Sequence, residues 1–372
     1  MSSPKEPRDL SSKHQLLSLV EANPFISQQD LADQLGLSRS AVAGHLAQLT
    51  KEGRILGRAY VLPQRQPIVC LGGTNLDRKL RGLGELQMGS SNPARQHESP
   101  GGVARNIAEN LARLGLPVHF LTAVGRDAAG QALLAQLQAL GVDCAGCLQA
   151  ADAPTGSYTA VLDPRGELLI ALADMALTDR LDPMFLRQTA PHRAAARWVV
   201  ADLNLSRQTL DELRAEARVR GQSLLLVAVS EPKMAHLGED LRGVELLVLN
   251  RGELQALTGR KLGSESALRA AWRQLREAGL KRLVMSDGAR GLRFSEGDEF
   301  ATMAPPELDP RSVREVTGAG DAMTAGIAAA LHRDPDDLRA ACALGLKLAA
   351  LTLQSDATVS EALSPALLAP PV

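Results

Sequence analysis

The most informative stretch of this 372-residue chain is Val316-Thr317-Gly318-Ala319-Gly320-Asp321-Ala322-Met323, which an apolar segment follows from Thr324 to Leu331. Small residues at the start of a predicted helix let the backbone approach a ligand, and their N–H groups form a cradle for phosphate. The residues expected to form this anion hole are Gly318, Ala319 and Gly320. Asp321 lies within it, where its carboxylate can take a proton from a hydroxyl that attacks a γ-phosphate. The motif G-x-G-D alone would also fit a glycine-rich helix entry, but the longer string favours the catalytic interpretation.

From residue 67 onward, strand and helix patterns alternate along the chain. The predicted strands are Ile68–Leu71, Val118–Val124, Trp198–Asp202, Ser223–Val229, Leu246–Asn250 and Arg282–Ser286. The predicted helices are Ala104–Leu114, Ala129–Leu140, Gln208–Arg220 and Ala267–Ala278. Such alternation predicts βαβ units, a mostly parallel sheet and helices on both of its faces. Two further segments, Arg78–Glu98 and Ser157–Ala171, have the character of hairpins or edge strands and are expected to form a small lid sheet.

Residues 1–66 are expected to form a separate domain, which the polar linker Pro63–Pro67 joins to a second domain, residues 67–372. A first helix is predicted from His14 to Asn23. Ser27 and Ser38 have the character of caps for two further helices, and Gly36 supplies a tight turn between them. The apolar residues that would lock these two helices at a fixed angle are Leu31, Leu35, Val42 and Leu46.

This pattern has the spacing of a helix-turn-helix. Its second helix would present outward Arg39, Ser40, Ala43, Gly44 and Gln48, and Arg54–Leu62 predicts a two-stranded wing in which Arg54 and Arg58 contact phosphate. The segment resembles the winged helix-turn-helix domains of bacterial transcription regulators, which implies binding to duplex DNA. The alternative is a three-helix module without DNA, because eight Lys or Arg against six Asp or Glu give residues 1–66 a net charge of only +2.

Composition limits the class of protein. Hydrophobic residues make up 45% of the chain and charged residues 22%, with a formal net charge of −1, which is typical of globular proteins and indicates no overall affinity for membranes. No apolar run approaches the roughly 18 residues of a membrane-spanning helix, and Met1–Leu10 is not typical of a signal peptide, so we expect a cytoplasmic location.

Cys144 and Cys147 form a lone C-x-x-C motif, which we expect to be incidental; a redox pair is the alternative.

Several motifs after Ile68 resemble the ribokinase family of carbohydrate kinases, also called the phosphofructokinase B family. They are Gly72-Gly73-Thr74-Asn75-Leu76-Asp77, Pro100-Gly101-Gly102-Val103-Ala104-Arg105-Asn106, Gly125-Arg126-Asp127-Ala128-Ala129-Gly130, Asn250-Arg251-Gly252-Glu253, Ser286-Asp287-Gly288-Ala289-Arg290-Gly291 and the Val316–Met323 stretch. The resemblance implies an α/β fold, a three-layer α/β/α sandwich with a small β lid. It also implies transfer of phosphate from ATP to an alcohol group, with Mg²⁺ as a cofactor. Singly, such motifs also fit turns and caps; their order carries the resemblance.

The resemblance implies roles for particular residues. Those that would bind the sugar are Asn75, Asp77, Gly101, Gly102 and Asn106, with the two glycines as a hinge of the lid. Those that would bind ATP and Mg²⁺ are Asn250, Glu253, Ser286, Gly288, Gly291 and Thr317, with Glu253 on the side of the metal. The chemistry agrees, because Asn75 and Asp77 alternate at a predicted strand end, where open α/β sheets bind ligands. Glu315 stands where some relatives carry an Asp associated with a monovalent cation, so dependence on K⁺ stays open.

Within the family, the sequence is most similar to pseudouridine kinases. The segments concerned are Ser99–Leu111, Ala173-Asp174-Met175, Val200–Asn204 and Val316–Met323. The similarity implies that Asp174 lies near the substrate, although a turn residue at a strand end is the alternative. Many relatives carry an acidic residue near Val227, so that carboxylate is missing here or supplied elsewhere. Ribose, inosine and other nucleosides stay open as substrates, because a base pocket is built from scattered side chains.

The resulting expectation is a kinase that converts pseudouridine and ATP to pseudouridine 5′-phosphate and ADP, with Asp321 as the base. Expected partners are the nucleoside or sugar, ATP, duplex DNA and a second copy in a homodimer. One alternative is a transcription regulator whose kinase fold only senses a nucleoside; the intact Asp321 argues against it, because a sensor needs no base. Another is an enzyme whose N-terminal module only drives oligomerisation. The operator, and any coupling of substrate to DNA binding, stay open.

Overall fold

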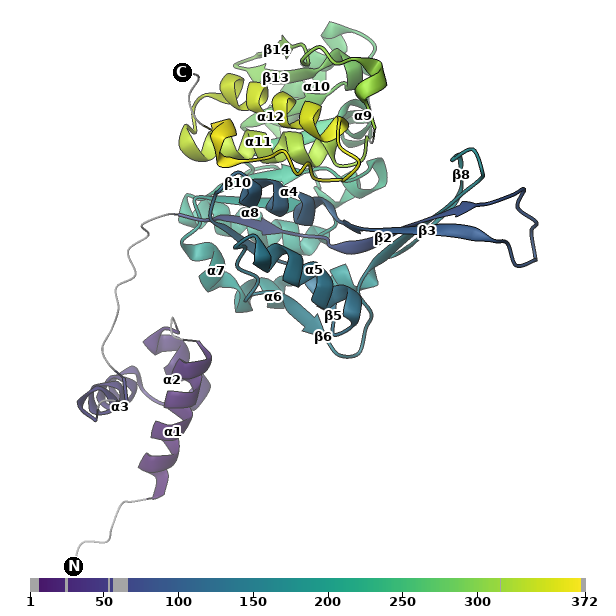
Figure 1. Cartoon of the computed structure of the whole chain (residues 1–372). Helices are drawn as coiled ribbons and strands as arrows, with labels where there is room; N and C mark the ends of the chain where they lie inside the picture. Colours follow the sequence, from purple (N-terminus) through teal and green to yellow (C-terminus); the bar gives the residue numbers. More distant parts are fainter. Residues whose placement is uncertain (1–6, 24–25, 53, 56–65, 315, 369–372) are drawn as a thin grey trace, which may run out of the picture. The chain divides into compact units, whose positions relative to one another are not determined.

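The computed structural model of the chain describes residues 7–23, 26–52, 54–55, 66–314 and 316–368. Contacts within the chain divide it into two compact units, residues 1–64 and 65–372. The first unit is helical, and the second is an α/β unit from which a narrow lid projects (Figure 1). Every helix in the described part of the chain is too short or too polar to cross a membrane.

Three helices form the first unit: α1 (Pro7–Ala22), α2 (Gln28–Leu35) and α3 (Arg39–Lys51). The predicted caps are confirmed, since the Ser27 hydroxyl accepts a hydrogen bond from the N–H of Asp30 at 3.0 Å and the Ser38 hydroxyl accepts one from Ala41 at 3.2 Å. Such bonds satisfy N–H groups that the first helical turn leaves unpaired. Gly36 ends α2 with a left-handed φ of 63°. The buried core is aliphatic and comprises Leu16, Leu17, Leu31, Ala32, Val42 and Leu49.

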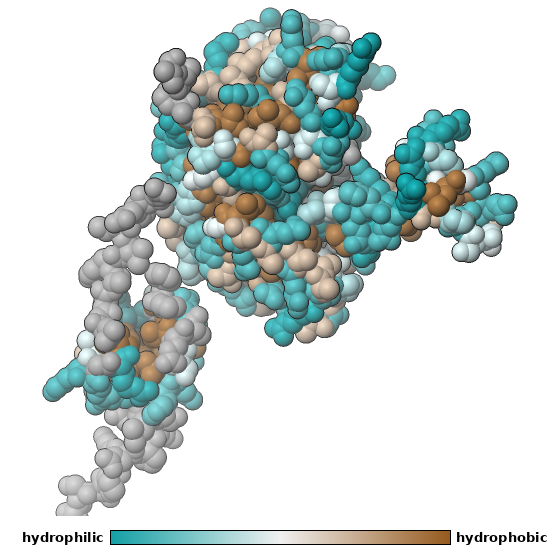
Figure 2. All heavy atoms as spheres, viewed as in Figure 1, coloured by the Kyte–Doolittle hydropathy of each residue, from teal (hydrophilic) through white to brown (hydrophobic). Residues whose placement is uncertain are grey.

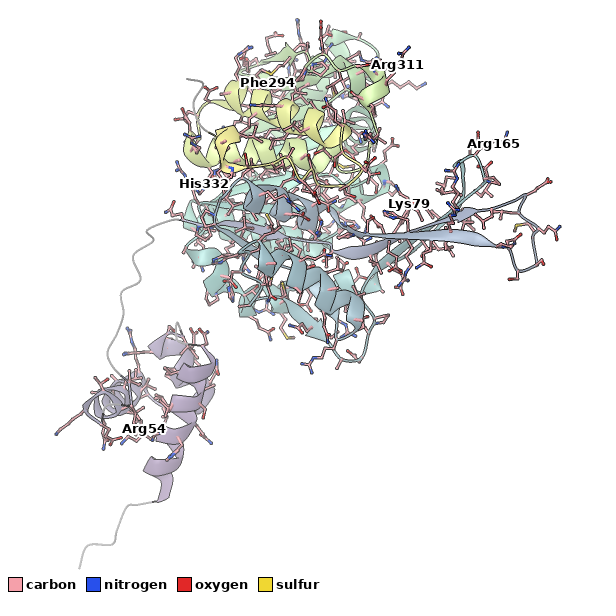
Figure 3. The ribbon with its side chains drawn as sticks, viewed as in Figure 1. Arg54, Lys79, Arg165, Phe294, Arg311 and His332 are labelled. Carbon is pink, nitrogen blue, oxygen red and sulfur yellow. The ribbon has the colours of Figure 1, made fainter. Side chains whose placement is uncertain are left out.

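Two predictions for this unit differ from the structure or are not covered by it. Helix α1 begins at Pro7, earlier than the predicted start at His14, and the fixed φ of proline suits the first position of a helix. The predicted wing over Arg54–Leu62 falls mostly outside the described residues, and so does Arg58. Arg54 lies just beyond α3 and is exposed (Figure 3).

An eight-stranded sheet forms the centre of the second unit, in the order β14-β13-β12-β11-β10-β9-β1-β4. Its strands are β1 (Ile68–Leu71), β4 (Val118–Leu121), β9 (Trp198–Asp202), β10 (Ser223–Val227), β11 (Leu246–Asn250), β12 (Arg282–Ser286), β13 (Leu292–Glu296) and β14 (Glu299–Met303). Strands β4 to β12 along this order are parallel, and β13 and β14 add an antiparallel hairpin at one edge. The predicted mostly parallel sheet is therefore confirmed, and its strand carboxyl ends share one edge.

Alternate residues of the strands contribute to two hydrophobic cores. In β1, Ile68 and Cys70 belong to one core, whereas Val69 and Leu71 belong to the other. Successive side chains of a strand point to opposite faces, so both faces of the sheet are covered (Figure 1). Helices that contribute to the first core are α4 (Val103–Arg113), α5 (Ala128–Ala139), α11 (Ala319–Arg333) and α12 (Leu338–Leu353). Those of the second are α6 (Pro183–Gln188), α8 (Arg207–Arg220), α9 (Arg251–Thr258) and α10 (Glu265–Glu277).

The lid is a four-stranded sheet in the order β3-β2-β7-β8. Its strands are β2 (Asn75–Gly82), β3 (Ala94–Gly101), β7 (Ser157–Leu162) and β8 (Leu168–Asp174). Parts of both predicted lid segments, Arg78–Glu98 and Ser157–Ala171, lie in these strands, and the remaining residues of each segment connect two of them. Strand β8 forms one edge, and hydrophobic residues are visible on the lid surface (Figure 2).

Two predicted strands end earlier than expected. Strand β4 ends at Leu121, and the following β5 (Ala123–Gly125) pairs with β6 (Leu148–Ala150) in a separate two-stranded sheet. Thr122 lies at this break, where its hydroxyl donates to the carbonyl of Gly72 at 2.7 Å. That bond ties the chain, at the point where it leaves the central sheet, to the turn after β1. Strand β10 ends at Val227 rather than Val229.

Candidate active site

Asp321 lies in the first turn of α11, which begins immediately after Gly318. Gly318 has a left-handed φ of 87°, and a Cβ there would lie 2.1 Å from the carbonyl oxygen of Thr358, so only glycine fits this entry. The side-chain amide of Asn106 donates to Asp321 Oδ2 at 2.8 Å. The structure therefore places a carboxylate from the C-terminal motif against an amide from the predicted sugar-binding motif.

The pKa of Asp321 is raised to about 7, chiefly by burial. The carboxylates of Asp202 and Asp77 raise it further, while the hydrogen bond from Asn106 and the charge of Arg105 oppose the rise. Arg105 is itself buried, forms an ion pair with Glu109 and donates to Asn106 Oδ1 at 3.1 Å. A carboxylate with this pKa can accept a proton near neutral pH.

Asn75 and Asp77 begin the lid strand β2. The Asn75 amide donates to Asp77 Oδ1 at 2.5 Å, Asn75 is buried, and burial raises the pKa of Asp77. Asn75 lies opposite Gly101 in the register of β2 and β3, and a Cβ on Gly101 would lie 2.4 Å from Asp77 Oδ2. Gly101 therefore leaves the space that the Asp77 carboxylate occupies.

Gly102 connects β3 to α4 with a left-handed φ of 103°. A Cβ there would lie 2.4 Å from the carbonyl oxygen of Gly73. The turn after β1 and the start of α4 thus touch through their backbones. The structure brings together all five residues of the predicted sugar site beside Asp321: Asn75, Asp77, Gly101, Gly102 and Asn106.

Asp174 ends β8, where it lies opposite Ser157 of β7, and Ser157 in turn lies opposite Leu76 of β2. A Cβ on Gly156 would lie 3.4 Å from the carbonyl oxygens of both Asp174 and Thr74. Asp174 is therefore at the base of the lid, close in space to the segment that carries Asn75.

Asp202, for which the sequence predicts no role, lies at the centre of this arrangement. It is 0% exposed at the end of β9. Its carboxylate accepts hydrogen bonds from the backbone N–H groups of Gly73 at 2.9 Å, Ala104 at 3.0 Å and Asn204 at 3.0 Å. It thereby joins the turn after β1, the start of α4 and the end of β9. Burial raises its pKa.

Five of the six residues predicted to bind ATP and Mg²⁺ lie at or just after the ends of neighbouring strands β11 and β12, and the sixth, Thr317, precedes α11. Asn250 and Glu253 form a capping box at the start of α9: Asn250 Oδ1 accepts from the N–H of Glu253 at 2.9 Å, and Glu253 Oε2 accepts from the N–H of Asn250 at 2.7 Å. Burial raises the pKa of Glu253, and the carboxylate of Glu231 adds to the rise. The N-x-x-E spacing therefore has a structural function in this chain, whatever else it does.

Ser286 ends β12, and the turn that follows contains Gly288 and Gly291 with φ values of 58° and 87°. Within this turn, Asp287 is held by two ion pairs, with Arg251 Nη2 and Arg290 Nη2, both at 2.6 Å. These arginines hold the pKa of Asp287 well below its usual range. The Arg251 pair fixes the turn against α9. Thr317 is exposed just before the entry to α11.

In the first unit, α3 exposes Arg39, Ser40 and Gln48, while Val42 and Leu49 on its other side are buried. The Ser40 hydroxyl lies 2.9 Å from that of Ser38 and shares a hydrogen bond with it. The predicted recognition helix thus has a polar exposed face, to which Arg54 adds a cation just beyond the helix (Figure 3).

We predict that Asp202→Asn destabilises the kinase unit by about 1–3 kcal/mol, because the side-chain NH₂ would face backbone N–H groups and leave buried donors unpaired. Thermal unfolding of the full chain measures the effect. Asp152→Asn is the matched control, since Asp152 is an exposed carboxylate paired with Arg180, and its replacement should leave the midpoint unchanged. Equal midpoints for the two variants would contradict the role of Asp202.

Comparison with known proteins agrees with this geometry. Residues 65–364 match the model of the pfkB family of carbohydrate kinases, and residues 11–55 match that of a winged helix-turn-helix DNA-binding domain. The chain is 36% identical over 268 residues to the pseudouridine kinase of Escherichia coli, covering 71% of this chain and 83% of that protein. It is 32% identical over 320 residues to the uncharacterized sugar kinase YeiI of the same organism, covering 84% and 85%.

Among solved structures, a carbohydrate kinase from Agrobacterium tumefaciens superposes with a TM-score of 0.71 at 35% identity, covering 82% of this chain and 95% of that one. Arabidopsis thaliana ribokinase, solved with ribose and ATP, has a TM-score of 0.71 at 18% identity, covering 80% and 96%, and so shares the fold. The chain therefore belongs to the pfkB family of carbohydrate kinases, ATP-dependent enzymes, and carries a winged helix-turn-helix domain before its kinase domain.

Proposed function

We propose that the protein phosphorylates the 5′-hydroxyl of a nucleoside, pseudouridine in particular, and that Asp321 is the catalytic base. The observation that carries this proposal is the hydrogen bond from the Asn106 amide to the Asp321 carboxylate at the start of α11, close to Asp77. A carboxylate of raised pKa next to sugar-binding polar groups suits the removal of a proton from an alcohol.

In this mechanism, Asn75, Asp77 and Asn106 hold the ribose hydroxyls through hydrogen bonds. Asp321 accepts the proton of the attacking hydroxyl as the new bond to phosphorus forms. The backbone N–H groups at the start of α11, which belong to Gly318, Ala319 and Gly320, stabilise the negative charge that develops on the transferred group. The asymmetric pairing of Asn75 with Asp77 orients one carboxylate oxygen and leaves the other directed toward Gly101.

ATP with Mg²⁺ supplies the phosphoryl group and neutralises its charge. The residues fit such a group, because Glu253 and Glu231 bring two carboxylates close enough that one raises the pKa of the other, and a dication would relieve that repulsion. Glu231, four residues after Val227, could supply the carboxylate that this chain lacks near Val227. We propose that the nucleotide lies along Asn250, Ser286, Gly288, Gly291 and Thr317.

The choice of pseudouridine rests on the identity with the Escherichia coli pseudouridine kinase and on the placement of Asp174 beside the segment that carries Asn75. We propose that Asp174 contacts the substrate from the base of the lid.

We also propose that K⁺ activates the enzyme. This proposal comes from Glu315 in the sequence, and Glu315 lies outside the described residues. Because the reaction consumes ATP and the chain carries a domain of a DNA-binding class, we propose a cytoplasmic location.

A second function, binding to duplex DNA, is proposed for residues 1–66. It is supported by the match to a winged helix-turn-helix model and by the exposed Arg39, Ser40 and Gln48 on α3. We further propose that the chain acts as a homodimer, because a two-fold operator requires two copies of the reading helix. Strand β8 offers a surface for the second copy, since it is a sheet edge with exposed apolar side chains, namely Leu168, Leu169, Ile170 and Leu172.

We predict that Asp321→Asn keeps the fold and ATP binding but lowers kcat by about 10²–10⁴-fold, the usual contribution of a general base. In the wild type, kcat/KM should fall as the pH drops below about 7, because Asp321 is then protonated and cannot accept a proton. Steady-state assays between pH 5 and 9 test both statements. Asp334→Asn, an exposed residue just after α11, is the control and should behave as the wild type.

A substrate panel should show a kcat/KM for pseudouridine at least about tenfold above that for uridine, inosine, ribose or fructose 6-phosphate, because a buried group that bonds the C-linked base is left unpaired by the wrong ligand. A preference for inosine or ribose would contradict the substrate and leave the family unaffected. Absence of turnover with every member of the panel would instead favour a nucleoside-sensing regulator.

The full-length protein is expected to enrich genomic fragments at low salt that a form lacking residues 1–66 does not enrich. In shift assays on such a fragment, Arg39→Ala should cost about 1–3 kcal/mol and relax specificity, as expected for a base contact. Arg58→Ala should weaken binding to all sequences alike and flatten the salt dependence. Equal enrichment by the two forms would show that residues 1–66 are a structural module.

Sedimentation velocity should show a dimer for the wild type and a monomer for Leu172→Lys, because a charge on the apolar edge would have to be buried against the second copy. Arg165→Ala, at the turn between β7 and β8, is the matched control and should stay dimeric (Figure 3). A dimer that survives Leu172→Lys would place the interface elsewhere.

A further inference from the structure

Three side chains with metal-binding atoms converge at β4, on the sheet edge opposite the hairpin β13–β14. They are His119 in β4, Asp143 in the segment after α5, and His192 in the short helix α7 (Ala190–Ala194). One ligand atom from each lies within 4.8 Å of the other two. The proposed reaction uses none of these residues, and the motifs of the kinase domain do not include them.

The backbone on which two of these residues stand is held firmly. Asp143 forms a parallel bridge with His119, in which the N–H of Phe120 donates to the carbonyl of Asp143 at 2.8 Å and the N–H of Asp143 donates to that of Val118 at 2.9 Å. The two residues therefore sit side by side whatever their side chains bind. A site on fixed backbone loses little conformational entropy when a ligand orders it.

Helix α7 is anchored as well. Arg193, next to His192, is 1% exposed and its guanidinium donates to Glu216 Oε2 and to the carbonyl of Leu186, both at 2.7 Å. The anchor holds the His192 ring over β4, where it packs edge-on against the His119 ring with centroids 6.1 Å apart. Three separate segments thus bring one ligand atom each to within 4.8 Å of the other two.

Hydrogen bonds satisfy the polar atoms of this group only in part. Asp143 Oδ1 accepts from the N–H of Ala145 at 2.8 Å. His119 Nε2 and Asp143 Oδ2 are 3.7 Å apart, too far for a hydrogen bond. His119 Nδ1 is buried and has no hydrogen-bond partner among the described residues. A histidine–aspartate pair that existed only to stabilise the fold would be expected to close this distance.

We propose that His119, Asp143 and His192 bind one divalent transition-metal ion of the Zn²⁺ type. Two imidazoles and one carboxylate are a donor set that such ions accept, with water in the remaining position. Tetrahedral ligands at about 2.0–2.1 Å from zinc lie roughly 3.3 Å from one another, so small rotations of these side chains would close the site.

The ion would tie β4 to α7, and its effect would be on stability rather than on phosphoryl transfer. It is also a different class of site from the pair Glu231 and Glu253, whose oxygen ligands suit Mg²⁺. Cys144 and Cys147 lie in the same segment as Asp143, and the Cys147 thiol is directed to the carbonyl of Phe120 at 3.1 Å. A site made by these two thiols is the rival explanation of any zinc that binds here.

The test uses the full chain, stripped of metal with a chelator and dialysed against micromolar Zn²⁺ in excess Mg²⁺, with zinc measured by atomic spectrometry. The wild type should retain one equivalent. His119→Gln, His192→Gln and Asp143→Asn should each weaken binding by more than about tenfold. His97→Gln, an exposed histidine on β3, is the matched control and should retain zinc, as should the double variant Cys144→Ser/Cys147→Ser.

Zn²⁺ should also raise the unfolding temperature of the wild type and of His97→Gln but not of His192→Gln, because a ligand that binds only the folded state stabilises it. Circular dichroism and kinase activity with Mg²⁺ and ATP verify that each variant is folded. The proposal is overturned if the wild type retains no zinc, if folded His119→Gln and His192→Gln both retain it as the wild type does, or if only the cysteine variant loses it.

Discussion

The buried carboxylate of Asp202 is the interaction on which the proposed site depends. Three segments that are distant in the sequence, at Gly73, Ala104 and Asn204, donate their backbone N–H groups to this one side chain. Because Asp202 is fully buried, each donor would be unpaired without it. The turn that leads to Asn75 and Asp77 and the helix that carries Asn106 are thereby fixed relative to each other before any substrate arrives, which is the preorganisation that binding and catalysis require.

Local signals in the sequence predicted the elements well. Ser27, Gly36 and Ser38 mark helix ends by their own hydrogen bonds and backbone conformations, which need no tertiary context, and strands β9, β11 and β12 have the predicted bounds. The break after Leu121 was missed because it depends on Thr122 bonding to Gly72, a contact across the fold. Asp202 was left without a role for the same reason: a buried aspartate at a strand end and an exposed turn residue look alike in a sequence.

The site residues divide in a similar way. Asn75, Asp77, Gly101, Gly102 and Asn106 were predicted from motifs, and the structure brings them to Asp321. The Asn250–Glu253 motif shows that a spacing can have two explanations, since the capping box alone would account for it. The cluster of His119, Asp143 and His192 could not be predicted from the sequence, because a β-bridge and a helix bring together residues that are far apart in the chain and form no motif. The neighbouring Cys144 and Cys147, by contrast, form a C-x-x-C motif that is visible in the sequence.

The mutual repulsion of carboxylates around Asp321 has a consequence for selectivity. The carboxylates of Asp77 and Asp202 raise the pKa of Asp321, while the guanidinium of Arg105 lowers it. If Asp321 is the base, as proposed, such a pocket would bind uncharged ligands in preference to those that already carry a phosphate near the reacting hydroxyl. In the proposed reaction Asp321 takes up the proton of the attacking hydroxyl, so the new phosphate group of the product would be repelled by the remaining carboxylates of Asp77 and Asp202. The negative potential of the site would thus have two effects: it would weaken the binding of phosphorylated ligands, and it would speed the dissociation of the phosphorylated product.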